Sequence, residues 1–265
     1  TRIEPPIHPA GLEKHVQHFG IDHNDFTWEA FENFVIDTAK KDKDITTKGI
    51  FAPWMLYKED HLSIGGHDQR FTPYGYEDSD IFNRWIQAGY EMIQSRDSLC
   101  YHMTCRGHRW NEGVGVENSD YKETMDRCRR EFLRKWGEWI QNDKYQYPII
   151  HPKYDKGLIV KNCNEQFIEM LEPWFDTLYV DCDYKNYIEK ESKRTITDLF
   201  DRIKPYDNEK QNNILVSVDA SSFNQQDYIF LSQLAAIIQD SGQIGDFELG
   251  NLKINIIHMR EYLNN

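Results

Sequence analysis

Residues 65–90 of the chain read GGHDQRFTPYGYEDSDIFNRWIQAGY. This stretch joins a double glycine to a group of acids, Glu77, Asp78 and Asp80, and then to an amphipathic segment. Apolar residues recur at helical spacing after the acids, so we expect a helix over residues 78–88 with the acids at its N-terminal end. The arrangement predicts a glycine-rich turn that leads into an acidic helix start.

A second dense cluster follows at residues 101–110, which read YHMTCRGHRW. It brings together histidine, cysteine and arginine, the residue types that bind metals and phosphates. We therefore expect residues 65–90 and residues 101–110 to form one site that the rest of the chain supports.

The totals limit the class of protein. A chain of 265 residues is long enough for one large domain or two ordinary ones, and its 14% aromatic content predicts a core or ligand surface rich in rings. The net charge of −13 argues against a general nucleic-acid binder, whose affinity comes from neutralising phosphates. It leaves open a nucleotide that is bound through a metal ion, because the cation supplies positive charge locally.

The five cysteines form no CxxC pair, so we expect free thiols in a reducing compartment rather than a structural zinc site. No apolar run approaches the roughly twenty residues that a membrane span needs, and no signal peptide opens the chain. These features predict a soluble, cytoplasmic protein without a membrane span. The first residues, TRIEPPIHP, lack Met and read like the middle of a protein, which suggests a fragment.

The pattern along the chain predicts an α/β protein in two parts, divided at residues 144 and 145. The prolines before residue 20 predict a loop, and residues 145–154 read as a linker. The first part, residues 1–144, is expected to hold helices over 26–43, 78–88 and 120–141, a strand within 49–57, and short extended pieces at 90–93 and 98–102. The second part, residues 145–265, is expected to alternate strands (158–161, 177–181, 214–219, 252–258) with helices (165–171, 196–203, 227–239). Such alternation predicts βαβ units around a parallel sheet.

The acidic turn allows two interpretations. Asp78 or Ser79 is suited to cap the helix over 78–88, since a carboxylate there is stabilised by free N–H groups and the helix dipole. Three acids beside Tyr74 and Tyr76 exceed what capping needs, however. A carboxylate next to aromatic surface also suits a general base that acts on a hydroxyl, with the rings as a platform for a sugar. The Gly65-Gly66 pair likewise fits either a tight turn or close approach of a ligand to the backbone.

The residues of the second cluster also allow two interpretations each. His102 and His108 suit a metal ion, since neutral imidazole binds Mn²⁺ or Zn²⁺, but a histidine at a strand end also serves structure. Arg106 and Arg109 suit a diphosphate, and they could equally pair with the many acids of the chain.

Several of these residues together resemble a known family. The resemblance is to the acceptor-side half of GT-A glycosyltransferases, of the family-2 type and the galactosyltransferase C-terminal segment. The residues that carry it are Asp60, Gly65, Gly66, Asp68, Phe71, Gly75, Glu77, Asp78, Asp80, Phe82, Arg84 and Gly89. It covers about residues 1–110.

The resemblance implies roles for individual residues. Asp78 is the implied catalytic base, and Glu77, Asp80, Trp54, Gly66, Asp68 and Tyr76 are implied acceptor contacts. His102, with His108 in reserve, is the implied ligand of a divalent cation, Mn²⁺ or Mg²⁺, that holds the sugar-nucleotide diphosphate, and Arg106 and Arg109 are candidate diphosphate contacts.

The chain departs from the family at three points. His67 stands where the family has Phe, and Tyr76 stands where it has a second glycine. No donor-binding half with a DxD motif precedes Gly65. The Asp181-Cys182-Asp183 sequence lies downstream, in the second part, so we interpret it as a carboxylate pair at a strand end.

The resemblance implies a glycosyltransferase of the hexosyltransferase class. Such an enzyme moves a sugar from a nucleotide-sugar to a hydroxyl of a carbohydrate or glycoconjugate, with inversion and with the help of a metal. One alternative is a non-catalytic carbohydrate-binding or assembly protein that lacks the donor half. The other is a glycoside hydrolase, for which adjacent acids are badly placed because its carboxyls lie on opposite sides of the bond. The donor sugar, the acceptor, the oligomeric state and the role of residues 145–265 stay undetermined at the sequence level.

Overall fold

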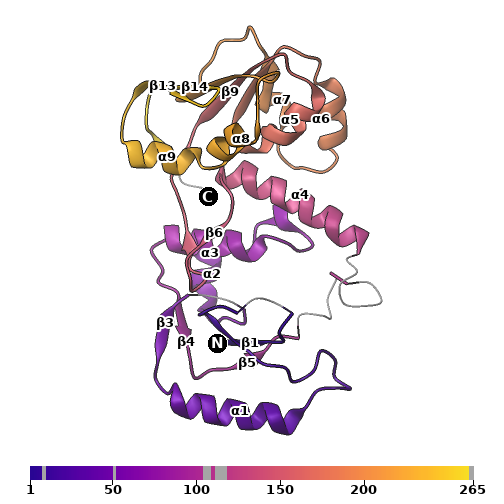
Figure 1. The fold of residues 1–265 in the computed structure, drawn as a ribbon, viewed down its shortest axis with the longest axis vertical. Coiled ribbons are helices and arrows are strands. Elements are labelled where there is room, and N and C mark those ends of the chain that lie inside the picture. The colour runs from indigo at the N-terminus through magenta and orange to yellow at the C-terminus, as the bar shows by residue number, and fades with distance from the viewer. Residues whose placement is uncertain (8–9, 50–51, 104–108, 111–117, 263–265) are drawn as a thin grey trace. The chain divides into compact units, whose positions relative to one another are not determined.

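The computed structural model describes residues 1–7, 10–49, 52–103, 109–110 and 118–262 (Figure 1). The chain divides into two compact units. Unit 1 comprises Thr1–Asp68, Glu77–Met125 and Ile140–Ile149, and unit 2 comprises Gln69–Tyr76, Asp126–Trp139 and Ile150–Asn265. The units are therefore interleaved along the chain, whereas the sequence suggested one division after residue 144, which stays a prediction.

Unit 1 is built from short strands and helices. A three-stranded parallel sheet has the order β2-β1-β5, and β3 pairs with β4 and β6 with β7 in antiparallel ladders. Its elements are β1 (Arg2–Glu4), β2 (Lys14–Val16), α1 (Trp28–Lys41), β3 (Thr46–Lys48), α2 (Lys58–Ser63), α3 (Glu77–Gln87), β4 (Ile93–Ser95), β5 (Cys100–Tyr101), the start of α4 (Ser119–Trp136), β6 (Gln141–Asn142) and β7 (Pro148–Ile149).

Helix α3 begins with the acidic turn and buries its apolar stripe. Ile81, Phe82 and Trp85 form a core cluster with Met92, and Trp54 packs against it. The helix ends at Gln87, and Gly89 just after it has a φ of +84°, a left-handed conformation that glycine adopts without strain. The prediction of a helix over 78–88 is thus confirmed within one residue at each end.

Two predictions for unit 1 differ from the structure. Within the range 49–57, the described residues 49 and 52–57 carry no strand, and the proline at position 53 cannot donate to a ladder. The opening, expected to be a loop, contributes β1 and β2. There Ile3 is fully buried and pairs with His15 and Tyr101 on the neighbouring strands.

Unit 2 is built around a six-stranded sheet with the order β11-β10-β9-β12-β14-β13. Strands β11, β10, β9 and β12 run parallel, as the βαβ prediction required, while β14 and β13 are antiparallel. Its elements are η1 (Gln69–Phe71), the rest of α4, β8 (Lys153–Tyr154), β9 (Lys156–Lys161), α5 (Glu165–Leu171), η2 (Glu172–Trp174), β10 (Thr177–Val180), α6 (Lys185–Glu191), α7 (Leu199–Arg202), β11 (Ile203–Pro205), β12 (Ile214–Asp219), α8 (Gln225–Ser232), α9 (Leu234–Ser241), β13 (Gly245–Leu249), β14 (Leu252–Ile256) and β15 (Glu261–Tyr262).

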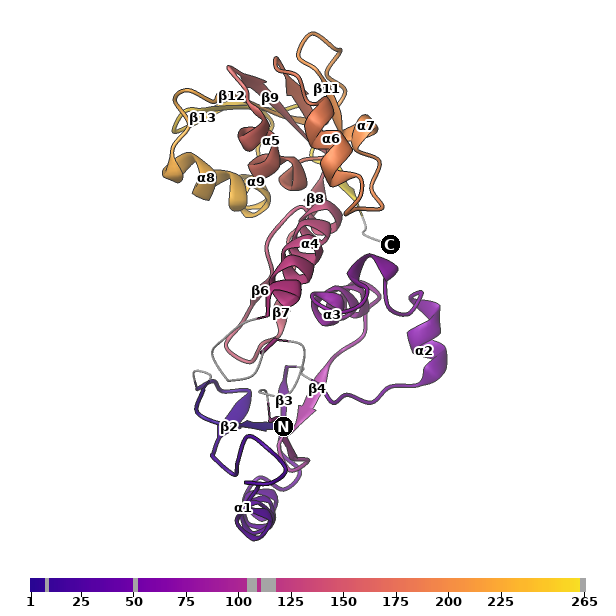
Figure 2. The same cartoon turned by 90° about the vertical axis from the view of Figure 1, so that its right-hand side faces the viewer.

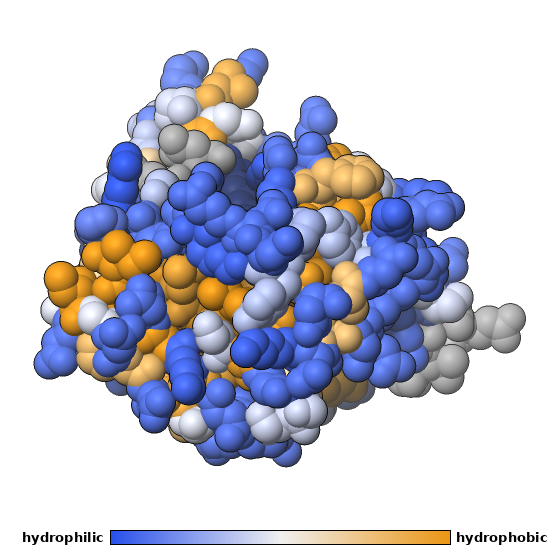
Figure 3. Space-filling view, turned by 90° about the horizontal axis from the view of Figure 1, so that it is seen from above, coloured by the Kyte–Doolittle hydropathy of each residue, from blue (hydrophilic) through white to orange (hydrophobic). Residues whose placement is uncertain are grey.

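The helices α5, α6, α8 and α9 lie on one side of this sheet (Figure 2). Alternate residues of the strands, such as Leu158, Val160 and Val216, point into one core with the apolar faces of these helices. Ile159 and Leu215 alternate with them and are only half-buried. Figure 3, which looks at unit 2 from the top of Figure 1, shows apolar patches between numerous hydrophilic side chains.

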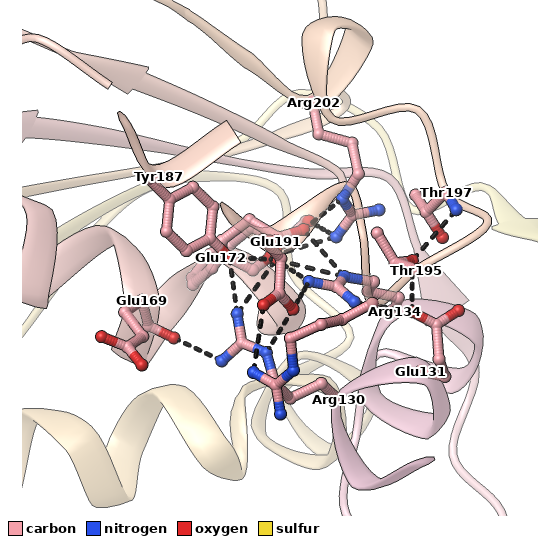
Figure 4. Close-up of polar contacts among 12 residues, drawn as sticks. Arg130, Glu131, Arg134, Glu169, Glu172, Tyr187, Glu191, Thr195, Thr197 and Arg202 are labelled. Carbon is pink, nitrogen blue, oxygen red and sulfur yellow. Dashed lines mark hydrogen bonds and ion pairs between the residues drawn. The ribbon is translucent and has the colours of Figure 1, made fainter. Parts of the chain in front are cut away.

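A buried ionic network ties the second half of α4 into unit 2 (Figure 4). Glu172 has no exposed surface and accepts hydrogen bonds from Arg134 at 2.6 Å and from Arg202 at 2.7 Å. Arg134 also pairs with Glu191 at 2.6 Å. Burial tends to raise the pKa of Glu172, but the charges of these arginines and of Arg130 outweigh it and lower the pKa to about 2.

The end of α4 has a local cause. The sequence predicted a helix as far as residue 141, but α4 stops at Trp136 because Gly137 takes a left-handed φ of +72°. Two lysine side chains then donate hydrogen bonds to carbonyl oxygens at the end of the helix. Lys153 Nζ donates to the oxygen of Lys135 at 2.7 Å, and Lys156 Nζ donates to that of Gly137 at 2.8 Å. Positive charge there also complements the helix dipole.

The described part of the chain is therefore a mixed α/β protein, which confirms the predicted fold class. Four of the five cysteines lie in the described part, and they are free thiols. Within the same residues, no helix is both long enough and apolar enough to cross a membrane.

Candidate functional site

The candidate base lies at the start of α3. Glu77 and Asp78 form its first turn and are half-buried. Asp78 Oδ1 accepts a hydrogen bond from the backbone N–H of Ser79 at 2.7 Å. Free N–H groups and the helix dipole stabilise a carboxylate in this position. Asp78 is thus held at a helix start without losing its access to solvent.

Asp80, two residues further along the first turn of α3, has a different environment. It has no exposed surface, and its Oδ2 accepts a hydrogen bond from Arg84 Nε at 2.9 Å. Arg84 donates onward to the carbonyl oxygens of Ile64 at 2.6 Å and Gly66 at 2.5 Å. Asp80 therefore fixes the arginine that fastens the glycine turn to α3. Its predicted contact with an acceptor stays a prediction.

The glycine turn needs glycine for conformational reasons. Gly65 and Gly66 have φ values of +86° and +66°, both left-handed. A Cβ at Gly66 would meet His61 Nε2 at 3.3 Å, so the position is also tight. Asp68 follows the turn and is half-buried. The turn interpretation of the glycine pair holds, and a ligand contact by Gly66 or Asp68 stays a prediction.

A cavity of about 590 Å³ opens beside α3 in unit 1. Aromatic rings line it, including Trp54, Tyr57 and Tyr90. The ring of Trp54 stands edge-on to that of Trp85, with centroids 5.0 Å apart, and Tyr57 is 79% exposed. Tyr90 Oη donates to Asp60 Oδ1 at 2.8 Å. Aromatic surface with a few fixed polar groups is the usual composition of a pocket for a small polar ligand.

The second cluster joins the parallel sheet of unit 1. His102 follows β5, and its Nδ1 lies 2.9 Å from Oε1 of the buried Glu4 on β1. Lys14 donates to the other oxygen of Glu4 at 2.7 Å, and Arg2 lies 3.2 Å from Glu4. Burial tends to raise the pKa of Glu4, but the hydrogen bonds of His102 and Lys14 and the charges of Lys14 and Arg2 lower it to about 2.

Arg2 connects the two stretches electrostatically. It also lies 3.7 Å from Glu13, and it lines the cavity beside α3. Burial lowers the pKa of Arg2, and the negative charges of Glu4, Glu13 and Asp78 oppose that lowering. One guanidinium is thus within electrostatic range of both Asp78 and the Glu4–His102 pair.

The described residues do not by themselves form a metal site. They contain no group of three His, Cys, Asp or Glu side chains that could hold an ion. His102 has the geometry of a ligand whose other nitrogen is oriented by a carboxylate. Its predicted companion, His108, lies outside the described residues.

Of the two arginines predicted to contact a diphosphate, one lies in the described part of the chain. Arg106 lies outside the described residues. The guanidinium of Arg109 lies over the ring of Trp110, 4.6 Å from its centroid. Its predicted contact with a diphosphate stays a prediction.

Several residues named from the sequence lie in unit 2, among them Tyr76 and Asp181. Tyr76 has a φ of +69°, and its ring packs against Phe132 at 5.7 Å and Trp139 at 6.2 Å. Asp181, at the end of β10, accepts hydrogen bonds from the backbone N–H groups of Asn162 at 2.8 Å and Cys163 at 2.9 Å. Tyr76 therefore takes part in packing, and Asp181 organises a strand end.

Sequence reasoning passed over Arg2 and Glu4. Both flank the buried Ile3 in an alternating polar–apolar–polar pattern, which is a signal of a short strand. The prolines that follow favoured a loop instead, so the strand was not predicted. Tyr57 and Tyr90 were also missed, because isolated tyrosines carry no motif.

The comparisons with known proteins concern the part of the chain that contains the end of α1, the glycine turn and α3. Residues 36–106 match a family model described as the N-terminal domain of galactosyltransferase. No curated protein matches the chain, and no solved structure does. The match spans the glycine turn and the acidic start of α3, and it is consistent with the predicted GT-A-like segment. The chain therefore carries a galactosyltransferase-like glycosyltransferase segment.

Proposed function

We propose that unit 1 provides the acceptor-side site of an inverting glycosyltransferase. The enzyme would transfer a sugar from a nucleotide-sugar to a hydroxyl of a carbohydrate or glycoconjugate, with Asp78 as the base. One observation carries this proposal. The family match covers the acidic start of α3, where Glu77 and Asp78 are half-buried and Asp80 is fully buried; of the two half-buried acids, we assign the base to Asp78 and an acceptor contact to Glu77.

The proposed reaction is a single displacement. Asp78 takes the proton of the acceptor hydroxyl as its oxygen attacks the anomeric carbon of the donor sugar. The bond from that carbon to the diphosphate oxygen breaks, and the electron pair leaves with the nucleoside diphosphate. Attack from the face opposite the leaving group inverts the configuration at that carbon.

Trp54, a proposed acceptor contact, lines the cavity beside α3, whereas the proposed base Asp78 is not among its lining residues. The cavity supplies a surface for the acceptor. Its rings offer flat apolar surface to the faces of a sugar, and Asp60 and Arg2 offer polar groups at its walls. Trp54 is held edge-on against Trp85, so its ring is already ordered before an acceptor binds. Ordered aromatic surface lowers the entropy cost of binding.

The divalent cation remains part of the proposal. When bound, a Mn²⁺ or Mg²⁺ ion would neutralise charge on the leaving diphosphate. His102, oriented by Glu4, is the candidate ligand within the described residues. The base function of Asp78 does not depend on this assignment.

The test is the Asp78→Asn variant, with release of nucleoside diphosphate and formation of product followed from UDP-galactose and a panel of other nucleotide-sugars. Loss of a general base lowers the rate by about 10²–10⁴-fold, and asparagine keeps the shape of the side chain. Asp37→Asn, an exposed change on α1, is the matched control and should leave the rate unchanged. Transfer at the normal rate by Asp78→Asn would sink the assignment.

The same assay separates the alternatives. Sugar binding by the wild-type protein without transfer from any nucleotide-sugar would favour a carbohydrate-binding protein. Cleavage of a plain oligosaccharide without a nucleotide-sugar would favour a glycoside hydrolase. We expect neither.

A further inference from the structure

A hollow of about 250 Å³ in unit 2 shares no lining residue with the cavity beside α3. It is formed by η1, the middle of α4 and the segment after α6. The residues that matter here are Arg70, Arg127, Glu131, Lys193, Arg194 and Thr195. Four of these carry positive charge, in a chain whose net charge is −13. Such a concentration of cations is the composition of an anion site.

Glu131 is the unusual member of the set. Its side chain is 1% exposed, and its Oε1 accepts hydrogen bonds from Arg134 Nη1 at 2.6 Å and from Thr195 Oγ1 (Figure 4). Its Oε2 is buried and has no hydrogen-bond partner in the described part of the chain. Buried acceptors are nearly always paired, so this oxygen suits a donor from a water molecule or from a bound ligand.

The charge of Glu131 is partly offset. Arg134 pairs with Oε1 but is shared with Glu172 and Glu191, and the oxygen that is left without a partner, Oε2, needs an O–H or N–H group. A ligand that suits the hollow must therefore combine negative charge for the cations with at least one donor for Glu131.

The cations differ in how far they are already neutralised. Arg194 pairs with Asp126 at 3.0 Å and with Glu191 at 3.3 Å, so its charge is largely compensated. Arg127 donates to the carbonyl oxygens of Arg70, at 2.8 Å, and Thr72, which are neutral acceptors. Its positive charge therefore remains to attract an anion.

Lys193 adds a second available charge. Its Nζ lies 3.7 Å from Glu189, but the two side chains are 73% and 78% exposed. An exposed pair of this kind contributes little and separates at small cost. Lys193 can thus swing toward a ligand, while Arg127 is held in place by its carbonyls.

We propose that this hollow binds phosphate, either as inorganic hydrogen phosphate or as the phosphate group of a small hydroxylated monoester. Phosphate oxygens accept hydrogen bonds from Arg127 and Lys193, and the P–OH or a neighbouring hydroxyl donates to Glu131 Oε2 once the Glu131 side chain turns this buried oxygen toward the hollow. Sulfate has the same shape and charge as hydrogen phosphate but no proton at neutral pH, so it leaves Oε2 unpaired. The unpaired oxygen thus predicts discrimination between the two ions.

The test is calorimetry at neutral pH and constant ionic strength with three probes: inorganic phosphate, glucose 1-phosphate and sulfate. We expect phosphate or glucose 1-phosphate to bind at least about tenfold more tightly than sulfate, because only the phosphates can donate to the buried acceptor. Tighter glucose 1-phosphate indicates a monoester ligand, and tighter inorganic phosphate indicates the free ion. Equal binding of phosphate and sulfate, or binding of neither, overturns the proposal and leaves a hollow filled by water.

Single-residue variants test whether phosphate binds in this hollow. Lys193→Gln, an exposed change, should weaken phosphate several-fold, while its matched control Lys190→Gln on the exposed side of α6 should not. Glu131→Gln should reduce or reverse the ratio of phosphate affinity to sulfate affinity, because the new amide can donate a hydrogen bond to sulfate. If Glu131→Gln fails to fold, Lys193→Gln still decides, since unchanged phosphate affinity in that variant contradicts the assignment. The outcome is independent of the proposed transferase, which concerns unit 1.

Discussion

The Nε atom of Arg84 donates to Oδ2 of Asp80 across 2.9 Å, and the two side chains are 8% and 0% exposed. This pair lies within one helix, yet it determines more than helix stability. Through the two carbonyls that Arg84 also holds, the start of α3 and the Gly65-Gly66 turn become one rigid piece. The candidate base Asp78 stands on that piece.

Breaking this pair should destabilise unit 1. Asp80→Asn leaves Arg84 buried without a counter-charge, and we expect the free energy of unfolding to fall by about 3–5 kcal/mol. Urea denaturation measures this free energy of unfolding. Lys48→Gln, which removes an exposed pair with Glu91 at 3.5 Å, should change it by less than about 1 kcal/mol. Equal effects of the two changes would contradict the structural role of Asp80.

The exposed ring of Tyr57 should matter to acceptor binding rather than to chemistry. Tyr57→Ala removes aromatic surface from the wall of the cavity, so we expect the acceptor KM to rise about tenfold with kcat nearly unchanged. Met55→Ala is the control, since Met55 lines the same cavity and is 97% exposed but has no ring. A fall in kcat at constant KM would place Tyr57 in a different role.

The proposed cation gives a prediction for Glu4. If His102 binds the ion, Glu4 orients it, and Glu4→Gln should weaken Mn²⁺ binding about 10–100-fold without removing a ligand. His102→Ala should weaken it further. His23→Ala, on a side chain that is 85% exposed, should have no effect. Mn²⁺ affinity measured by calorimetry in the presence of UDP checks all three, and unchanged affinity in His102→Ala would remove His102 from the metal site.

Acid should destabilise both units. The pKa values of Glu4 and Glu172 are lowered from 4.5 to about 2 in the folded chain. Each carboxylate therefore contributes stability that is present above pH 4.5 and is lost as the pH falls toward 2. The free energy of unfolding in urea should decrease over that window. Glu172→Gln should flatten the decrease, whereas the same slope in variant and wild type would exclude Glu172 as a source.

Regular elements with a strong local pattern were predictable from the sequence. The helix over 165–171 and the strand over 214–219 are found at the predicted residues, because apolar spacing and turn signals agree there. The helix expected over 227–239 is instead α8 and α9, which meet at Gln233. Apolar periodicity continues through that break, so the sequence pattern does not reveal it.

The site was predictable only in part, for reasons of distance and packing. The acids at the start of α3 stand in one local motif, and the sequence indicates them directly. The pairing of Glu4 with His102 joins residues 98 positions apart, which no local pattern encodes. Likewise, the sequence cannot distinguish the fully buried Asp80 from the half-buried Asp78, because the difference comes from the core that α3 packs against.

The interleaving of the two units has a consequence for inheritance. Arg130 and Arg134, on the second half of α4, have their carboxylate partners Glu172 and Glu191 beyond residue 150. A chain cut after residue 144 would therefore leave Arg130 without its carboxylate partners and Arg134 with Glu131 alone. The whole network belongs to unit 2, so a transfer of the α/β unit to another protein has to include the second half of α4.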